Sequence, residues 1–176
     1  MSLEKGYIQI YTGNGKGKTT AALGQALRAA GSGLKTFIVQ FMKNSSCGEM
    51  RIFEQMRNWV TLEHYGNDSF VFSNEAAGEN DIYMAQQAFH SARKAISGGK
   101  YDIVILDEVC VAIFFELLKT QDVLSLLAEK PGNIELILTG RYCPPELIEK
   151  ADLVTEMQEI KHYYQKGVAA RKGIES

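Results

Sequence analysis

The sequence predicts an α/β fold with three layers, in which a mainly parallel sheet lies between two layers of helices. Short apolar runs rich in β-branched residues alternate along the chain with segments rich in helix-forming residues. Several of these runs are continuously apolar, which is typical of strands covered on both faces. The chain has 176 residues, of which 45% are hydrophobic, so we expect residues 1–176 to form a single domain with a sizeable core.

Six segments have the character of strands. The first is a β-branched and aromatic run that ends at Thr-Gly, the third alternates polar with apolar residues, and the fourth and fifth are continuously apolar. In chain order, the strands are expected at residues 7–11, 35–41, 60–65, 101–108, 134–140 and 152–160.

Five segments have the character of helices. The first closes on Gly31 and the third, rich in Ala and Gln, stops at Gly98-Gly99, since glycine commonly ends a helix. The fourth is one helix or two pieces, with Thr120 capping the second, and the fifth has proline near its start. The helices are expected at residues 19–31, 47–57, 75–97, 115–130 and 144–151.

Composition narrows the function classes. A formal net charge of -2 gives no global basic field for nucleic acid or a membrane surface. No apolar run approaches the roughly 20 residues of a membrane span, and the first residues contain no apolar signal region. The three cysteines are far apart in the sequence, so neither a zinc site nor disulfides are expected. This cysteine usage is typical of a protein of the reducing cytoplasm.

A glycine-rich segment between the first strand and the first helix predicts a phosphate-binding loop. Inward-facing amides and the positive end of the helix would bind an anion. Lys18, expected to face solvent and ligand, would reach phosphate oxygens, and the Thr19 hydroxyl would reach a magnesium ion. Thr12 replaces the first glycine of the usual pattern G-x-x-x-x-G-K-[ST], and the alternative is a plain glycine turn. The expected ATP-binding residues are Gly13, Asn14, Gly15, Lys16, Gly17, Lys18, Thr19 and Thr20.

Charged residues at two other strand ends support this loop. Asp107 and Glu108 end the fourth strand, at the edge where open α/β sheets bind ligands. With Thr19, they are the expected ligands of Mg²⁺, or of Mn²⁺ in its place. Arg141 follows the fifth strand and would meet an anion on the same rim, or be an ordinary surface arginine. The fold is therefore expected to be P-loop NTPase-like, of the RecA-like kind.

The segments "TGNGKGKTT", "VQF", "VILDEV", "TGR" and "KGIE" together resemble the ATP:corrinoid adenosyltransferases, the cobalamin-pathway type with a phosphate loop. The resemblance runs from about residue 6 to 175, and the threonine at position 12 is the family's own form of the loop. The resemblance implies that a Co(I) corrinoid attacks the 5′ carbon of ATP and displaces the whole triphosphate, with Lys18 and Thr19 in catalytic roles.

The same resemblance implies partners. Phe70 and Phe72 match a phenylalanine and a tryptophan with which the family displaces the lower axial ligand of the corrinoid. A flavodoxin-like or flavin reductase would supply the electron, and the family suggests a homodimer. The alternative functions are a P-loop small-molecule kinase and a non-catalytic nucleotide-dependent regulator or corrinoid-binding partner.

Overall fold

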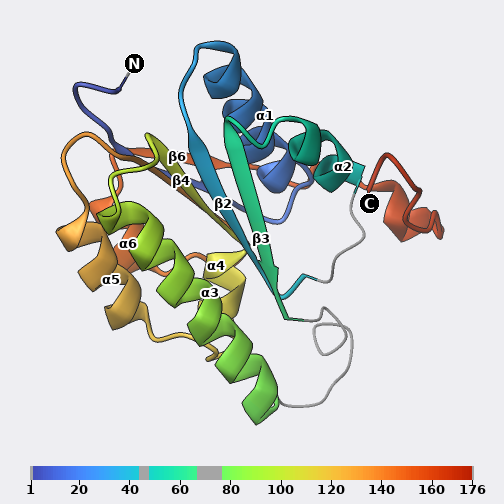
Figure 1. The fold of residues 1–176 in the computed structure, drawn as a ribbon. Coiled ribbons are helices and arrows are strands. Elements are labelled where there is room, and N and C mark those ends of the chain that lie inside the picture. The colour runs from blue at the N-terminus through green and yellow to red at the C-terminus, as the bar shows by residue number, and fades with distance from the viewer. Residues whose placement is uncertain (1, 44–47, 67–76, 176) are drawn as a thin grey trace.

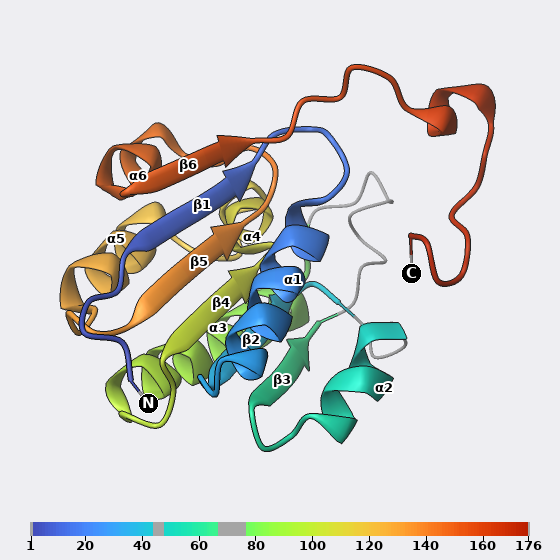
Figure 2. The ribbon, with the colours of Figure 1, turned by 90° about the horizontal axis from the view of Figure 1, so that it is seen from above.

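The computed structural model describes residues 2–43, 48–66 and 77–175. Its strands form one sheet in the order β3-β2-β4-β5-β1-β6, and every pairing among the described strands is parallel. Figures 1 and 2 show this sheet from two sides. The strands are β1 (Ile8–Thr12), β2 (Thr36–Phe41), β3 (Val60–Tyr65), β4 (Ile103–Asp107), β5 (Glu135–Thr139) and β6 (Leu153–Glu156).

Helices cover both faces of the sheet, so the predicted three-layer α/β fold is confirmed. Helices α1 and α2 lie on one face, and α3, α4, α5 and α6 lie on the other (Figure 1). A separate apolar core fills each side. The helices are α1 (Lys18–Gly31), α2 (Gly48–Gln55), α3 (Glu79–Ser97), α4 (Val109–Phe114), α5 (Thr120–Glu129) and α6 (Pro145–Lys150), followed by a short 3₁₀ helix, η2 (Tyr163–Lys166).

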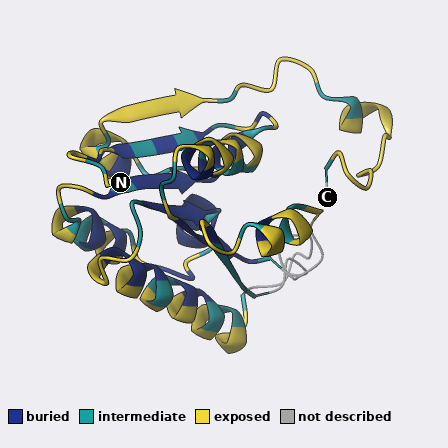
Figure 3. Cartoon of the chain, turned by 45° about the horizontal axis from the view of Figure 1, so that its top comes forward, coloured by how far each residue is buried: buried dark blue, intermediate teal, exposed yellow. Residues whose placement is uncertain are grey.

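The central strands are buried on both faces because their apolar residues alternate between the two cores. In β4, for example, Ile103 and Ile105 pack toward α1, while Val104 and Leu106 pack toward α3. The edge strand β6 is different, since all four of its residues are exposed. Figure 3 shows the contrast between the dark central strands and β6.

The six predicted strands are confirmed: the bounds of β3 agree with the prediction, and those of the other strands shift by at most four residues. The largest shift is in β6, which ends at Glu156 rather than at residue 160. The predicted helix over 47–57 corresponds to α2, and the one over 75–97 corresponds to α3, which begins at Glu79. Phe70 and Phe72 lie outside the described residues.

One helix was not predicted, and the prediction over residues 115–130 is wrong in part. Helix α4 follows β4 after a single residue, and α5 begins only at Thr120. The segment of α4, "VCVAIF", is apolar throughout and buried over its first five residues, so its sequence shows no helical periodicity. Thr120 is not the cap of α5: Lys119 holds that position, and no side-chain hydrogen bond caps the helix.

No helix among the residues that the structure describes is long and apolar enough to cross a membrane.

The glycine after β5 permits a close approach that positions the site. Gly140 has φ +138°, and a Cβ atom there would lie 2.9 Å from Cys110 Cβ and 3.0 Å from the Val111 amide nitrogen. We expect Gly140→Ala to lower the free energy of unfolding by about 3 kcal/mol, from backbone strain and overlap with α4. Gly24→Ala is the matched control, because nothing lies within 4 Å of that Cβ. As a mid-helix change it should stabilise by about 1 kcal/mol.

Urea unfolding of the two variants and the unchanged protein measures both effects. Equal unfolding free energies for the two variants would contradict the packing argument.

Candidate functional site

The glycine-rich loop over residues 13–17 joins β1 to α1 and is held by the segment that follows β6. Gly13 and Gly17 have φ +92° and +120°, conformations that L side chains rarely adopt. The Gly15 amide donates to the Met157 carbonyl at 2.6 Å, and a Cβ atom on Gly15 would lie 2.7 Å from that oxygen. The loop glycines therefore serve both the turn and the close contact with residue 157.

Lys18 is buried, which corrects the expectation that it faces solvent. The residue is only 6% exposed. Its Nζ donates to the carbonyl oxygens of Gly13 at 2.7 Å and Gly15 at 2.8 Å, so the ammonium group closes the loop from inside. Burial lowers the pKa of Lys18, and the nearby carboxylate of Glu108 opposes that shift.

The other predicted loop residues are more open. Asn14 and Thr20 are exposed. Lys16 also extends away from the loop, and its Nζ donates to the Ile174 carbonyl at 2.6 Å. The structure therefore brings Lys18 and Thr19 toward the end of β4, while Lys16 reaches the end of the chain.

Asp107 is the centre of the site. It is fully buried, and its Oδ1 accepts hydrogen bonds from the hydroxyls of Thr19 at 2.8 Å and Thr139 at 2.7 Å. Its Oδ2 accepts from Gln40 Nε2 at 2.9 Å and lies 3.4 Å from Lys43 Nζ. The sequence predicts that Thr19 and Asp107 share a site, and the structure places them in direct contact.

Sequence reasoning missed a polar row that supports Asp107. Parallel register sets His64 of β3 beside Gln40 of β2, and Gln40 beside Asp107 of β4. His64 Nδ1 lies 3.0 Å from Gln40 Oε1. An amide oxygen can only accept, so Nδ1 carries the proton and the Gln40 NH₂ group is turned toward Asp107. Burial lowers the pKa of His64, which favours this neutral ring.

Glu108 stands at the junction of β4 and α4 in a strained conformation. Its φ is +67°, in the left-handed region, and its amide donates to Thr139 Oγ1 at 2.9 Å. Burial raises the pKa of Glu108, and the adjacent carboxylate of Asp107 raises it further. Strain and an unfavourable charge at one residue are typical of functional sites.

Arg141 lies on the same rim, as the sequence predicts from the end of the fifth strand. Its side chain is exposed and follows Gly140 directly. Burial is the largest influence on the pKa values of Lys18 and Glu108, and the charge of Arg141 also acts on both, which places it within electrostatic range. The contact of Arg141 with a bound anion stays a prediction.

The donor set at the end of β4 fits a magnesium ion. Thr19, Asp107 and Glu108 offer hydroxyl and carboxylate oxygens, which Mg²⁺ prefers. Across the described ranges, no cluster of three or more His, Cys, Asp and Glu side chains forms a complete metal cage. Mg²⁺ needs no such cage, because it keeps several waters and takes substrate phosphates as ligands.

The two adjacent carboxylates should respond oppositely to neutralisation. Asp107→Asn turns an acceptor of several hydrogen bonds into a group with two donors, so it should lower the unfolding free energy by about 2 kcal/mol. Glu108→Gln should raise the melting temperature at neutral pH, because it removes a charge that burial disfavours.

The pH dependence follows from the raised pKa of Glu108. Between its unfolded and folded pKa values the native state binds more protons, so its contribution makes the unfolding free energy fall as pH rises. Calorimetry in metal-free buffer measures this slope, and Glu108→Gln should flatten it. A lower melting temperature for Glu108→Gln than for the unchanged protein would contradict the burial argument.

Comparison with known proteins finds relatives over almost the whole chain. The family model described as ATP:corrinoid adenosyltransferase BtuR/CobO/CobP matches residues 4–176. The chain is 35% identical over 173 residues to the corrinoid adenosyltransferase of Escherichia coli K12, covering 98% of this chain and 86% of that one. It is 35% identical over 174 residues to a Sinorhizobium corrinoid adenosyltransferase, covering 98% and 81%.

A third relative is the corrinoid adenosyltransferase CobA of Salmonella typhimurium, which is 33% identical over 178 residues and covers 98% of this chain and 86% of that one. These matches extend through both the phosphate loop and the end of β4. The chain therefore belongs to the ATP:corrinoid adenosyltransferase family.

Proposed function

We propose that this chain transfers the 5′-deoxyadenosyl group of ATP to a reduced Co(I) corrinoid. The cobalt–carbon bond forms as the C5′–O5′ bond breaks, and the triphosphate leaves with that electron pair. The observation that carries the proposal is the contact of Thr19 with Asp107 at the mouth of a phosphate loop, in a chain of this family. The P-loop kinase alternative is not supported.

The loop suits a leaving group whose charge grows in the transition state. Backbone amides at the start of α1 and the Lys18 ammonium group can stabilise triphosphate oxygens. Lys18 now bonds the carbonyls of Gly13 and Gly15. Its role toward ATP therefore requires an exchange of these bonds for bonds to phosphate. Because the corrinoid itself is the nucleophile, the chemistry requires no activated serine, cysteine or general base.

Magnesium is the proposed metal, and it would neutralise charge on the triphosphate when bound. Thr19, Asp107 and Glu108 are the residues that would hold it, directly or through water. Thr139, Gln40 and His64 would fix the orientation of Asp107. We propose Arg141 as an additional contact to the triphosphate.

The corrinoid side of the site is proposed from the resemblance in sequence. Phe70 and Phe72 would displace the lower axial ligand, which eases reduction to Co(I). The electron would come from a flavodoxin-like or flavin reductase, and the active form would be a homodimer. The natural corrinoid would be cob(I)yrinic acid a,c-diamide or cob(I)alamin, and the values of kcat/KM for the two substrates would distinguish them.

An anaerobic assay tests the reaction and the role of Lys18. With ATP, Mg²⁺ and chemically reduced cobalamin, we expect loss of Co(I) absorbance with release of intact triphosphate. Lys18→Ala should lower kcat/KM at least about 100-fold, because it removes a charge that stabilises the leaving group. Lys94→Ala, an exposed lysine of α3, is the control.

Circular dichroism must show that Lys18→Ala remains folded, since this lysine also closes the loop. Release of ADP would refute the transfer, and wild-type rates for a folded Lys18→Ala would refute the site.

The role of Phe72 has its own test. When the reaction starts from Co(II) corrinoids with a reductant present, Phe72→Ala should lower kcat/KM with cobalamin at least about fivefold more than with cobinamide, because only cobalamin has a lower ligand to displace before reduction. Equal losses with both corrinoids would refute ligand displacement as its role.

A further inference from the structure

The end of the chain returns to the phosphate loop. After β6, the segment over residues 157–175, here called the C-terminal segment, contacts the loop at two places. At its start, the Met157 carbonyl accepts from the Gly15 amide at 2.6 Å. At its end, the Ile174 carbonyl accepts from Lys16 Nζ at 2.6 Å. The loop is therefore held from both ends of this segment.

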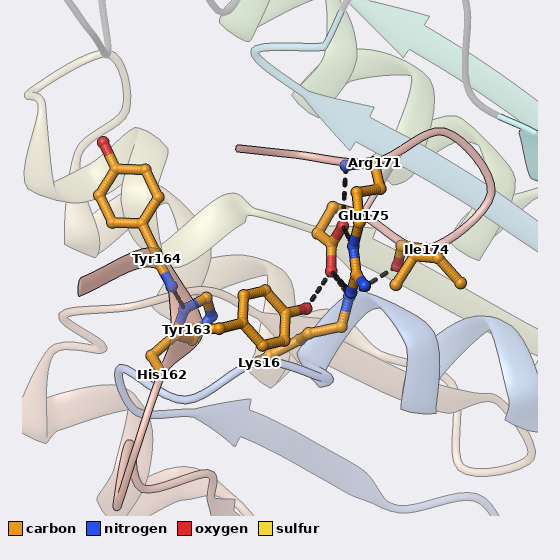
Figure 4. Close-up of polar contacts among 7 residues, drawn as sticks. All are labelled: Lys16, His162, Tyr163, Tyr164, Arg171, Ile174 and Glu175. Atoms are coloured by element: carbon orange, nitrogen blue, oxygen red, sulfur yellow. Dashed lines mark hydrogen bonds and ion pairs between the residues drawn. The ribbon is translucent and has the colours of Figure 1, made fainter. Parts of the chain in front are cut away.

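The Glu175 carboxylate accepts hydrogen bonds from three residues, Arg171, Tyr163 and Lys16, as Figure 4 shows. Its carboxylate accepts from the Arg171 amide at 2.8 Å and from the Arg171 guanidinium at 3.2 and 3.3 Å, and it also accepts from the Tyr163 hydroxyl. Lys16 Nζ donates to the same carboxylate at 3.3 Å. Hydrogen bonds from Arg171 and Tyr163 hold the pKa of Glu175 well below its usual range.

The two loop lysines are therefore held differently. Lys18 bonds carbonyls of the loop itself and is buried. Lys16 bonds two groups of the C-terminal segment, the Ile174 carbonyl and the Glu175 carboxylate, and its side chain is 42% exposed. An exposed pair at 3.3 Å is weak and exchangeable. A triphosphate in the loop would carry several negative charges close to Lys16 and compete for it.

We propose that Glu175 is a positioning residue for Lys16. In the free protein Glu175 binds Lys16 to the C-terminal segment, and when triphosphate enters the loop Lys16 binds the triphosphate instead. When Lys16 moves to the triphosphate, Glu175 still accepts hydrogen bonds from Arg171 and Tyr163, so its carboxylate is not left without a partner. Because Glu175 competes with the ligand, it weakens triphosphate binding and eases product release. This inference rests on the proposed function, since it requires triphosphate in the loop.

The test is a double-mutant cycle on the full chain, with inorganic tripolyphosphate and Mg²⁺ as the probe, by calorimetry at low salt. Glu175→Gln keeps the size and shape of the side chain and removes its charge, so it should tighten binding by about threefold to tenfold. Lys16→Met should weaken binding, and the double variant should bind like Lys16→Met alone. Glu159→Gln is the matched control, because Glu159 bonds Gln165 of the same segment.

Kinetics add a second readout that a merely structural role would not produce. Glu175→Gln should lower KM for ATP without raising kcat, whereas Lys16→Met should raise KM. Weaker or unchanged tripolyphosphate binding by Glu175→Gln, or additive effects in the cycle, would overturn this inference alone. Failure of the unchanged protein to bind either ATP or tripolyphosphate would overturn the proposed function as well.

Discussion

The buried carboxylate of Asp107 joins elements that lie far apart in the chain. It accepts hydrogen bonds from Thr19 on α1, Thr139 on β5 and Gln40 on β2. A fully buried charge is tolerable only when such donors replace the lost water. The same bonds fix the first turn of α1 against the sheet, and the phosphate loop is the connection just before that turn. The position of the loop therefore depends on an electrostatic requirement at the end of β4.

Local patterns were enough to predict the sheet, the loop and the two carboxylates, because each rests on neighbouring residues. The buried Lys18, the left-handed Glu108 and the polar row through Gln40 and His64 depend on strand register and packing. The register between two strands can be predicted from a sequence only when it is known which strands pair. Helix α4 was not predicted for a related reason: a short helix buried over most of its length lacks the alternation of apolar and polar residues that identifies a helix.

Several features of the site oppose stability in the protein alone. Glu108 combines a left-handed backbone with a carboxylate whose charged form burial disfavours. Lys18 is a buried cation that must find its partners among loop carbonyls. A ligand with both negative oxygens and a positive ion would stabilise both groups: the oxygens would pair with Lys18, and the ion would pair with Glu108. A magnesium–triphosphate complex would supply both. Charges that destabilise the free protein would then stabilise the complex.

The exposed edge strand β6 adds a consequence for dynamics. It pairs with β1 alone within the described sheet, all four of its residues are exposed, and Met157 follows it directly. Edge strands open locally at a free energy well below that of global unfolding. Each such opening would withdraw the Met157 carbonyl from the Gly15 amide without disturbing either core. Amide hydrogen exchange of β6 then reports on the loop, because it measures how often the Gly15 amide loses its hydrogen bond to Met157.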